Sequence, residues 1–178
     1  MKRALGLVAV LAASTLALAC KNVVPTFSLP GTDGKVYSAE SFLPKPTIVV
    51  FLKADCPGSP DLARSFSVLQ AELRGEVNVV GFVKLDANAA TSYAKEIGAY
   101  FPLIADPSGK TMAAFGAKRG GEFTFVASSK EARFPKIWDG YSRSLLAAAI
   151  EGIRHHGGTV SKVSLSAFPA EKTYGCRL

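Results

Sequence analysis

Hydrophobic residues in this chain form two kinds of pattern, continuous apolar runs and stripes at helical spacing. Thr47 to Leu52 and Val77 to Lys84 are continuous β-branched and apolar runs, which predict strands that are covered on both faces. Between them, apolar residues recur every three or four positions and Gly75 follows, which predicts a helix from about Pro60 to Leu73 with Ser59 as its N-cap. The residues of this stripe are Leu62, Phe66, Leu69 and Leu73.

The rest of the pattern continues the alternation of strands and helices. The expected elements are a hairpin about the turn Gly31–Gly34, a helical turn at Ser38–Phe42, a helix over Asn88–Ile97, a short strand at Leu103–Ile104, a short helix over Lys110–Phe115, a hairpin made by Glu122–Ala127 and Arg133–Trp138, and a helix over Ser142–His155. This order predicts an α/β domain with a central mixed β-sheet flanked by helices. Residues 159–178 alternate only weakly, and they either add an edge strand or stay mobile.

The N-terminus has the composition of an export signal. Lys2 and Arg3 precede an apolar stretch of roughly 15 residues, which is short for a membrane-spanning helix. We therefore predict a signal peptide over residues 1–19. The sequence Leu16-Ala17-Leu18-Ala19-Cys20 resembles a bacterial lipoprotein signal, which implies a lipid on Cys20 and a membrane anchor, although Ala17 stands where such signals usually have Leu. The alternative is cleavage by ordinary signal peptidase, which leaves a soluble exported protein with a free Cys20.

The remaining chain has the length of one ordinary domain, which we divide into residues 20–158 and a C-terminal extension over 159–178. The formal net charge is +7, but the basic residues are scattered, with no block longer than Lys118-Arg119. Nucleic acid is therefore not an expected partner. His155 and His156 are adjacent on a helix and point about 100° apart, so they do not form a two-ligand face, and we predict no metal and no other cofactor.

Cys56 is the main candidate for chemistry. It lies where the strand ending at Leu52 gives way to a helix, and free N–H groups at a helix start favour a thiolate. Ser59 occupies the position that would hold the second cysteine of a C-x-x-C motif. Exchange within such a motif is therefore excluded. If Cys20 is lipidated, Cys56 and Cys176 remain as an even pair in an oxidising compartment.

Several motifs together resemble the redoxin, or alkyl hydroperoxide reductase and thiol-specific antioxidant, branch of the thioredoxin-like superfamily. They are Phe27–Lys35, Ile48–Pro57, Phe101–Lys110 and Phe115–Ala117, in that order. The resemblance implies a thioredoxin-like fold and attack by Cys56 on a peroxide or a protein disulfide. The implied partners are that peroxide or protein-thiol substrate and an external thiol reductant.

The residues that usually assist such a cysteine are partly missing. Lys53 stands where peroxiredoxins usually have Thr or Ser, and the segment before Phe123 lacks the proline that faces the cysteine in thioredoxins. Lys53 and Arg119 remain as candidates for stabilising the thiolate, with Arg119 about three residues from the family's usual register. Cys176 could be a resolving thiol, a structural disulfide partner or an unpaired tail residue. We predict a thiol oxidoreductase or peroxidase-like protein of the bacterial envelope, and the alternative is a redox-inactive binding or assembly module.

Overall fold

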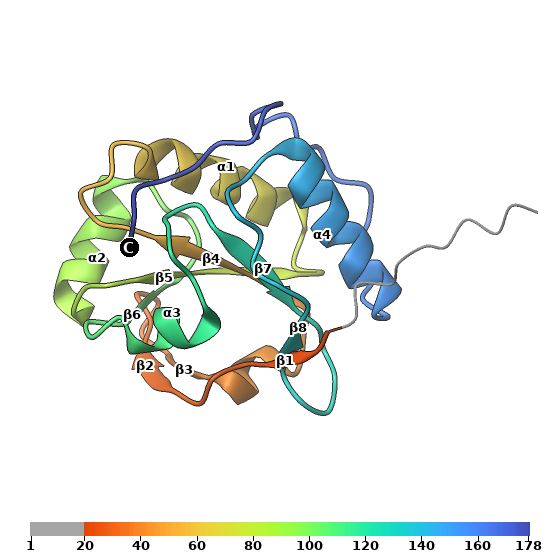
Figure 1. Ribbon diagram of the computed structural model, residues 1–178, viewed down its shortest axis with the longest axis horizontal. Helices are drawn as coiled ribbons and strands as arrows, with labels where there is room; N and C mark the ends of the chain where they lie inside the picture. Colours follow the sequence, from red (N-terminus) through yellow and green to blue (C-terminus); the bar gives the residue numbers. More distant parts are fainter. Residues whose placement is uncertain (1–19) are drawn as a thin grey trace, which may run out of the picture.

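The computed structural model describes residues 20–178, and the predicted signal peptide lies outside them. A four-stranded sheet in the order β6-β5-β4-β7 forms the centre of the molecule (Figure 1). β4 is parallel to β5 and antiparallel to β7, and β5 is parallel to β6, so the predicted central mixed sheet is confirmed. The four strands are β4 (Thr47–Leu52), β5 (Asn78–Val83), β6 (Leu103–Ala105) and β7 (Phe123–Val126).

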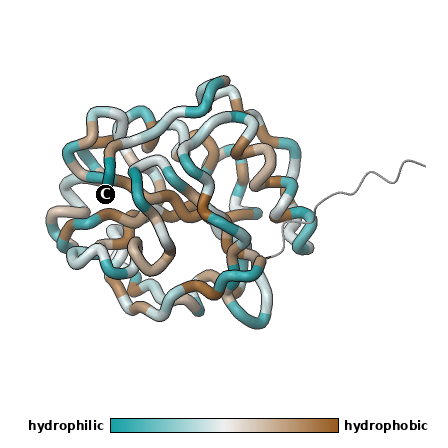
Figure 2. The backbone as a smooth tube through the Cα atoms, viewed as in Figure 1, coloured by the Kyte–Doolittle hydropathy of each residue, from teal (hydrophilic) through white to brown (hydrophobic). Residues whose placement is uncertain are grey.

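The two faces of the sheet carry separate hydrophobic cores. Along β4, Ile48, Val50 and Leu52 face one core, while Val49 and Phe51 face the other. This alternation gives the central strands their continuous apolar colour in Figure 2 and explains why the run in the sequence is unbroken. Helices α1 (Ser59–Glu72), α2 (Ala87–Glu96) and α4 (Arg143–His155) cover the first core. The second core lies under α3 (Lys110–Phe115), the 3-10 turn η1 (Ala39–Phe42) and the hairpin of β2 (Ser28–Pro30) with β3 (Val36–Ser38).

The helix caps differ from the prediction at α1. This helix begins at Ser59 and its N-cap is Gly58, and the Ser59 hydroxyl donates to the carbonyl of Lys53 instead of capping the helix. At α2 the side chain of Asp86 accepts a hydrogen bond from the N–H of Ala89, and at α4 Ser142 caps the N–H of Leu145. The helix boundaries otherwise lie within about one or two residues of those expected.

The expected hairpin near the end of the chain is only partly formed. β8 (Arg133–Phe134) pairs with β1 (Asn22–Val23), and it joins the β7 segment through a single bridge between Ala127 and Arg133. Trp138 returns to pair with Phe123 at the outer edge of β7. Both ends of the predicted hairpin therefore pair as expected, without a continuous ladder between them, and β8 has β1 as an additional partner.

The C-terminal extension folds back across the domain. In Figure 1 it leaves the end of α4, passes over α1 and ends beside the carboxyl end of β4. Isolated bridges join Thr173 to Tyr141 and Arg177 to Arg119. The extension thus adds short extended pairs at an edge, which is one of the two alternatives that the sequence left open. Within residues 20–178, no helix is both long enough and apolar enough to cross a membrane.

Candidate thiol–disulfide site

Cys56 lies in a tight turn between β4 and α1. Asp55 adopts a left-handed backbone conformation with φ of 63°, which Asp tolerates better than most residues, and this conformation turns the chain toward the helix. Cys56 is 8% exposed, and its carbonyl accepts a hydrogen bond from the N–H of Ser59. The sulfur is therefore held at a helix start, close to the surface but covered.

Hydrogen bonds from two side-chain hydroxyl groups fix the backbone of this turn. Ser59 Oγ and Tyr93 Oη both donate to the carbonyl oxygen of Lys53, at 2.8 and 2.9 Å. Ser59 is buried, so the position of a second redox cysteine is used here to fix the backbone that leads to Cys56. Burial also raises the pKa of Tyr93, which keeps its hydroxyl protonated as a donor.

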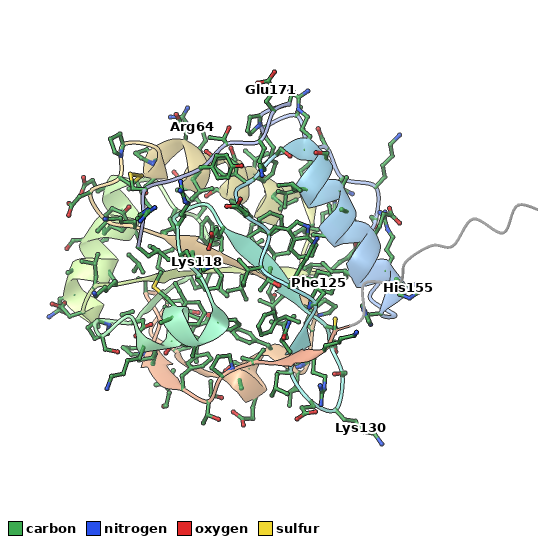
Figure 3. The ribbon with its side chains drawn as sticks, in the orientation of Figure 1. Arg64, Lys118, Phe125, Lys130, His155 and Glu171 are labelled. Carbon is green, nitrogen blue, oxygen red and sulfur yellow. A yellow bond between two sulfur atoms is a disulfide. The ribbon has the colours of Figure 1, made fainter. Side chains whose placement is uncertain are left out.

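Cys56 and Cys176 form a disulfide, with Cα atoms 5.8 Å apart and a separation of 120 positions in the sequence. In Figure 3 the yellow sulfur–sulfur bond lies near the start of α1. The backbone N–H of Cys176 also points at Cys56 Sγ, at 3.1 Å. A donor in this position would stabilise negative charge on Cys56 while the tail stays docked.

Backbone pairing places Cys176 over Cys56. The N–H of Gly120 donates to the carbonyl of Cys176, and the N–H of Gly175 donates to the carbonyl of Gly120, both at 2.8 Å. Farther along, the N–H of Leu178 donates to the carbonyl of Lys118 at 2.9 Å. The end of the tail is thus an added extended segment on the outer side of the loop 118–121.

Side chains fasten the earlier part of the tail to the helices. Phe168 is buried and packs edge-on against Phe66 of α1, with ring centroids 5.2 Å apart. Arg143 Nε donates to the carbonyl of Phe168 at 2.8 Å, and Ser65 Oγ donates to the carbonyl of Ala167 at 2.8 Å. The tail therefore has an apolar anchor at Phe168 and a polar tip that carries Cys176.

The two predicted thiolate-stabilising cations face other groups. The Arg119 guanidinium lies 5.7 Å from the ring centre of Tyr174, and Lys53 lines a cavity beside the turn. Among the contacts described for residues 20–178, none joins either cation to Cys56 Sγ. Their roles at the sulfur stay predictions, while the N–H of Cys176 is the donor that contacts it.

A cavity of about 640 Å³ opens next to the site, between the carboxyl ends of β4 and β5 and helix α3. Its lining combines polar side chains with apolar ones, and Leu178 is among the apolar ones. The polar lining residues are Lys53, Asp55, Lys84 and Ser108. The last residue of the tail thus borders both the loop 118–121 and this cavity. Its volume is in the range usual for small-molecule sites.

Cys20 lies far from the disulfide. Its Sγ is 3.3 Å from His156 Nε2, just beyond the end of α4, whereas Cys56 follows the opposite end of β4. Burial raises the pKa of the Cys20 thiol to about 11. Lipidation of Cys20 stays a prediction. In the part of the chain that the structure describes, no group of three or more His, Cys, Asp or Glu side chains could hold a metal ion.

Sequence reasoning missed the groups that position the tail. Glu122 is buried, and its carboxylate accepts a 2.6 Å hydrogen bond from the N–H of Lys118, which closes the loop that receives the tail. Gly121, with φ of 83°, donates to the carbonyl of Phe51 in β4, while Gly120 pairs outward. The pair Gly120-Gly121 indicates an unusual backbone in the sequence, but not what it contacts.

Comparison with known proteins agrees with this fold. The AhpC/TSA family model matches residues 20–136. MTB dsbF, solved in mixed oxidized and reduced forms, is 25% identical with a TM-score of 0.61, and the match covers 73% of this chain and 98% of that one. A putative thiol:disulfide interchange protein DsbE from Chlorobium tepidum is 20% identical, with a TM-score of 0.63 and coverage of 76% and 95%. The bacterioferritin comigratory protein of Xanthomonas campestris is 18% identical, with a TM-score of 0.61 and coverage of 78% and 99%.

A search of curated proteins found no match. The sheet order, the helix after β4 and the cysteine between them define a thioredoxin-like protein with a redoxin-type domain. The chain belongs to the AhpC/TSA family. The resemblance that the sequence motifs carry is therefore confirmed at the level of fold and family.

Proposed function

We propose that the protein is an exported thiol–disulfide oxidoreductase in which Cys56 is the nucleophile and Cys176 resolves the intermediate. The single observation that carries this proposal is the Cys56–Cys176 disulfide on a tail that also aims the N–H of Cys176 at Cys56 Sγ. Names among the structural neighbours, a DsbE and a dsbF, support the same chemistry. In this proposal, Cys176 near the C-terminus takes the role that the second cysteine has in a C-x-x-C motif.

The proposed catalytic cycle needs no cofactor, because the two cysteine thiols supply both electrons. The Cys56 thiolate attacks a partner disulfide, forming a mixed disulfide and releasing one partner thiolate, which takes up a proton. The Cys176 thiolate then attacks the Cys56 sulfur, forms the Cys56–Cys176 bond and releases the second partner thiolate. The partner is reduced by two electrons, and the protein dithiol becomes the disulfide. An external dithiol returns the protein to its reduced form.

Peroxide reduction is the second candidate, and the AhpC/TSA family match favours it. The Cys56 thiolate would attack the O–O bond and release an alcohol, leaving a sulfenic acid on Cys56. Condensation of that sulfenic acid with the Cys176 thiol would give the same disulfide and water. Lys53, in place of the family's usual Thr or Ser, makes this the weaker candidate.

The test is to reduce the protein, mix it with a disulfide peptide or with an alkyl hydroperoxide, and follow formation of the Cys56–Cys176 disulfide by mass spectrometry. We expect faster oxidation by the disulfide peptide than by the hydroperoxide, and none with Cys56→Ser. Cys20→Ser is the matched control, since that thiol lies at the other end of the sheet. If neither oxidant forms the bond faster than buffer alone, the chain is a redox-inactive module whose disulfide only fastens its tail.

The same proposal places the protein in the cell envelope, with a lipid on Cys20 as its anchor. Support comes from the sequence of residues 1–20 and from a disulfide, which persists in oxidising compartments. An anchor at Cys20 would leave Cys56 at the opposite end of the sheet, facing away from the membrane. Mass spectrometry of the membrane fraction should find Cys20 acylated, and Cys20→Ser should release the protein into the soluble fraction.

A further inference from the structure

The loop 118–121 has two sides that are both used for backbone pairing. On the inner side, the N–H of Gly121 donates to the carbonyl of Phe51 and the N–H of Phe51 donates to the carbonyl of Glu122, at 2.8 and 2.9 Å. On the outer side, Gly120 exchanges hydrogen bonds with Gly175 and Cys176 of the tail. The loop therefore extends the edge of the sheet, and the tail occupies that edge directly above Cys56.

Backbone atoms make most of the described contacts of the tail tip. The side chains of Tyr174, Arg177 and Leu178 are exposed, while the N–H of Leu178 and the carbonyl of Cys176 pair with the loop. Docking of this kind uses strand addition, which any extended polypeptide can supply. Once the disulfide is reduced, no covalent bond holds the tip on this edge.

One position of the tip is restricted. A Cβ atom on Gly175 would lie 2.6 Å from the carbonyl carbon of Gly120 and 3.0 Å from its Cα, both backbone atoms that cannot move aside cheaply. The residue before the docked cysteine must therefore be glycine for the pairing to keep this geometry. Another segment that docked with the same geometry would also need glycine before its cysteine.

We propose that the outer edge of the loop 118–121 is the docking site for an extended Gly-Cys segment of a partner protein, and that the tail competes with this segment for the edge. The inference rests on the proposed thiol–disulfide function and names its substrate class. The Cys56 thiolate attacks the sulfur of the docked partner cysteine, which is part of a disulfide, and forms the mixed disulfide while the other partner cysteine leaves as a thiolate and takes up a proton. When Cys176 returns to resolve it, Gly175 and Cys176 take back the edge, so that resolution and expulsion of the partner segment are one event.

The binding test uses the full chain and a fluorescent peptide spanning Ala170–Leu178, with serine in place of Cys176 so that no covalent bond forms. The reduced Gly175→Ala variant, whose own tail cannot dock, should bind the peptide at least about tenfold more tightly than the oxidised wild type does, a difference of about 1.4 kcal/mol. A second peptide with alanine in place of Gly175 should bind about tenfold more weakly than the first. Backbone amide NMR shifts should be confined to the loop 118–121 and its neighbours.

Glu171→Ala is the matched control variant, because Glu171 is on the same tail, projects from the crest of the tail in Figure 3 and is exposed. It should behave as the wild type in both redox states. In the reduced wild type the tail is no longer held by the disulfide but can still pair with the loop. This protein should therefore bind the peptide with an affinity between those of the oxidised protein and Gly175→Ala. Equal affinity in all states, or shifts away from the loop 118–121, would overturn the docking site.

A kinetic arm separates this inference from the proposed function. With a disulfide-bonded Gly-Cys peptide as substrate, Gly175→Ala should form the mixed disulfide at least as fast as the wild type, because its tail no longer competes for the edge. It should resolve this mixed disulfide at least about tenfold more slowly, because Cys176 is no longer aligned. If Cys56 exchanges disulfides while Gly175→Ala resolves them at the normal rate, the competition model is wrong and the oxidoreductase function stands. If Cys56 forms no mixed disulfide at all, the proposed function itself is wrong.

Discussion

The hydroxyl of Ser59 donates a 2.8 Å hydrogen bond to the backbone carbonyl of Lys53, across the turn that carries Cys56. Tyr93 donates to the same oxygen from α2, so the turn is tied to both the first and the second helix. Ser59 occupies the position where a thioredoxin-type site would have its second cysteine. Its polar side chain therefore fixes the backbone of the turn, and Cys176 of the tail supplies the second sulfur of the site.

Replacing Ser59 with alanine should lower the free energy of unfolding by about 1 kcal/mol, the usual contribution of one such hydrogen bond. Ser59→Ala combined with Tyr93→Phe should cost more than the sum of the two single changes, since the Lys53 carbonyl would then lose both donors. Urea denaturation of the four proteins measures this coupling. Ser92→Ala, on the exposed side of α2, should leave stability unchanged.

Removing the disulfide should destabilise the oxidised protein. Because the cross-link closes a loop of 120 residues, Cys176→Ser should lower the free energy of unfolding by about 2–4 kcal/mol, and dithiothreitol should have the same effect on the wild type. Denaturation with and without reductant measures both. A wild type whose stability does not respond to dithiothreitol would contradict the prediction.

The anchor at Phe168 should control how readily the disulfide is reduced. Phe168→Ala removes a buried ring from the first core and should cost about 3 kcal/mol, with the tail loosened most. Dithiothreitol should then reduce the Cys56–Cys176 bond faster than in the wild type, as followed by gel shift after alkylation. Lys162→Ala, an exposed change on the same extension, should alter neither stability nor the reduction rate.

The thiol of Cys20 gives a pH-dependent prediction for the protein without its signal peptide and without lipid. Its pKa rises from 9.0 to about 11 because burial disfavours the thiolate, so the folded state keeps this proton while the unfolded state loses it. Stability should therefore be unaffected by this group below about pH 9 and should fall as pH rises toward 11. Comparing the pH profiles of wild type and Cys20→Ser isolates the effect, and identical profiles would show that Cys20 is solvated.

Local signals predicted most elements of the fold. The continuous apolar run of β4 predicted a strand with a hydrophobic core on each face. Ser142 indicated the start of α4, because its side chain caps that helix. The bridges from Ala127 to Arg133 and from Phe123 to Trp138 belong to the hairpin that the sequence predicted, whereas the pairing of β8 with β1 was harder to predict because β1 lies far away in the sequence. Cys56 was identifiable as the candidate nucleophile because a strand-to-helix junction is itself a local pattern.

The sequence alone determined the sheet, its helices and the place of Cys56, since strand and helix periodicity and capping depend on neighbouring residues. It did not determine where Cys176 lies or what the loop 118–121 binds. The disulfide joins residues 120 positions apart, and the loop and the tail are also distant in the sequence. The contacts between loop and tail are made mainly by backbone N–H and carbonyl groups, which every residue type except proline supplies equally. Only the tertiary structure could bring the tail to that edge, through the anchor at Phe168 and the absence of a Cβ at Gly175.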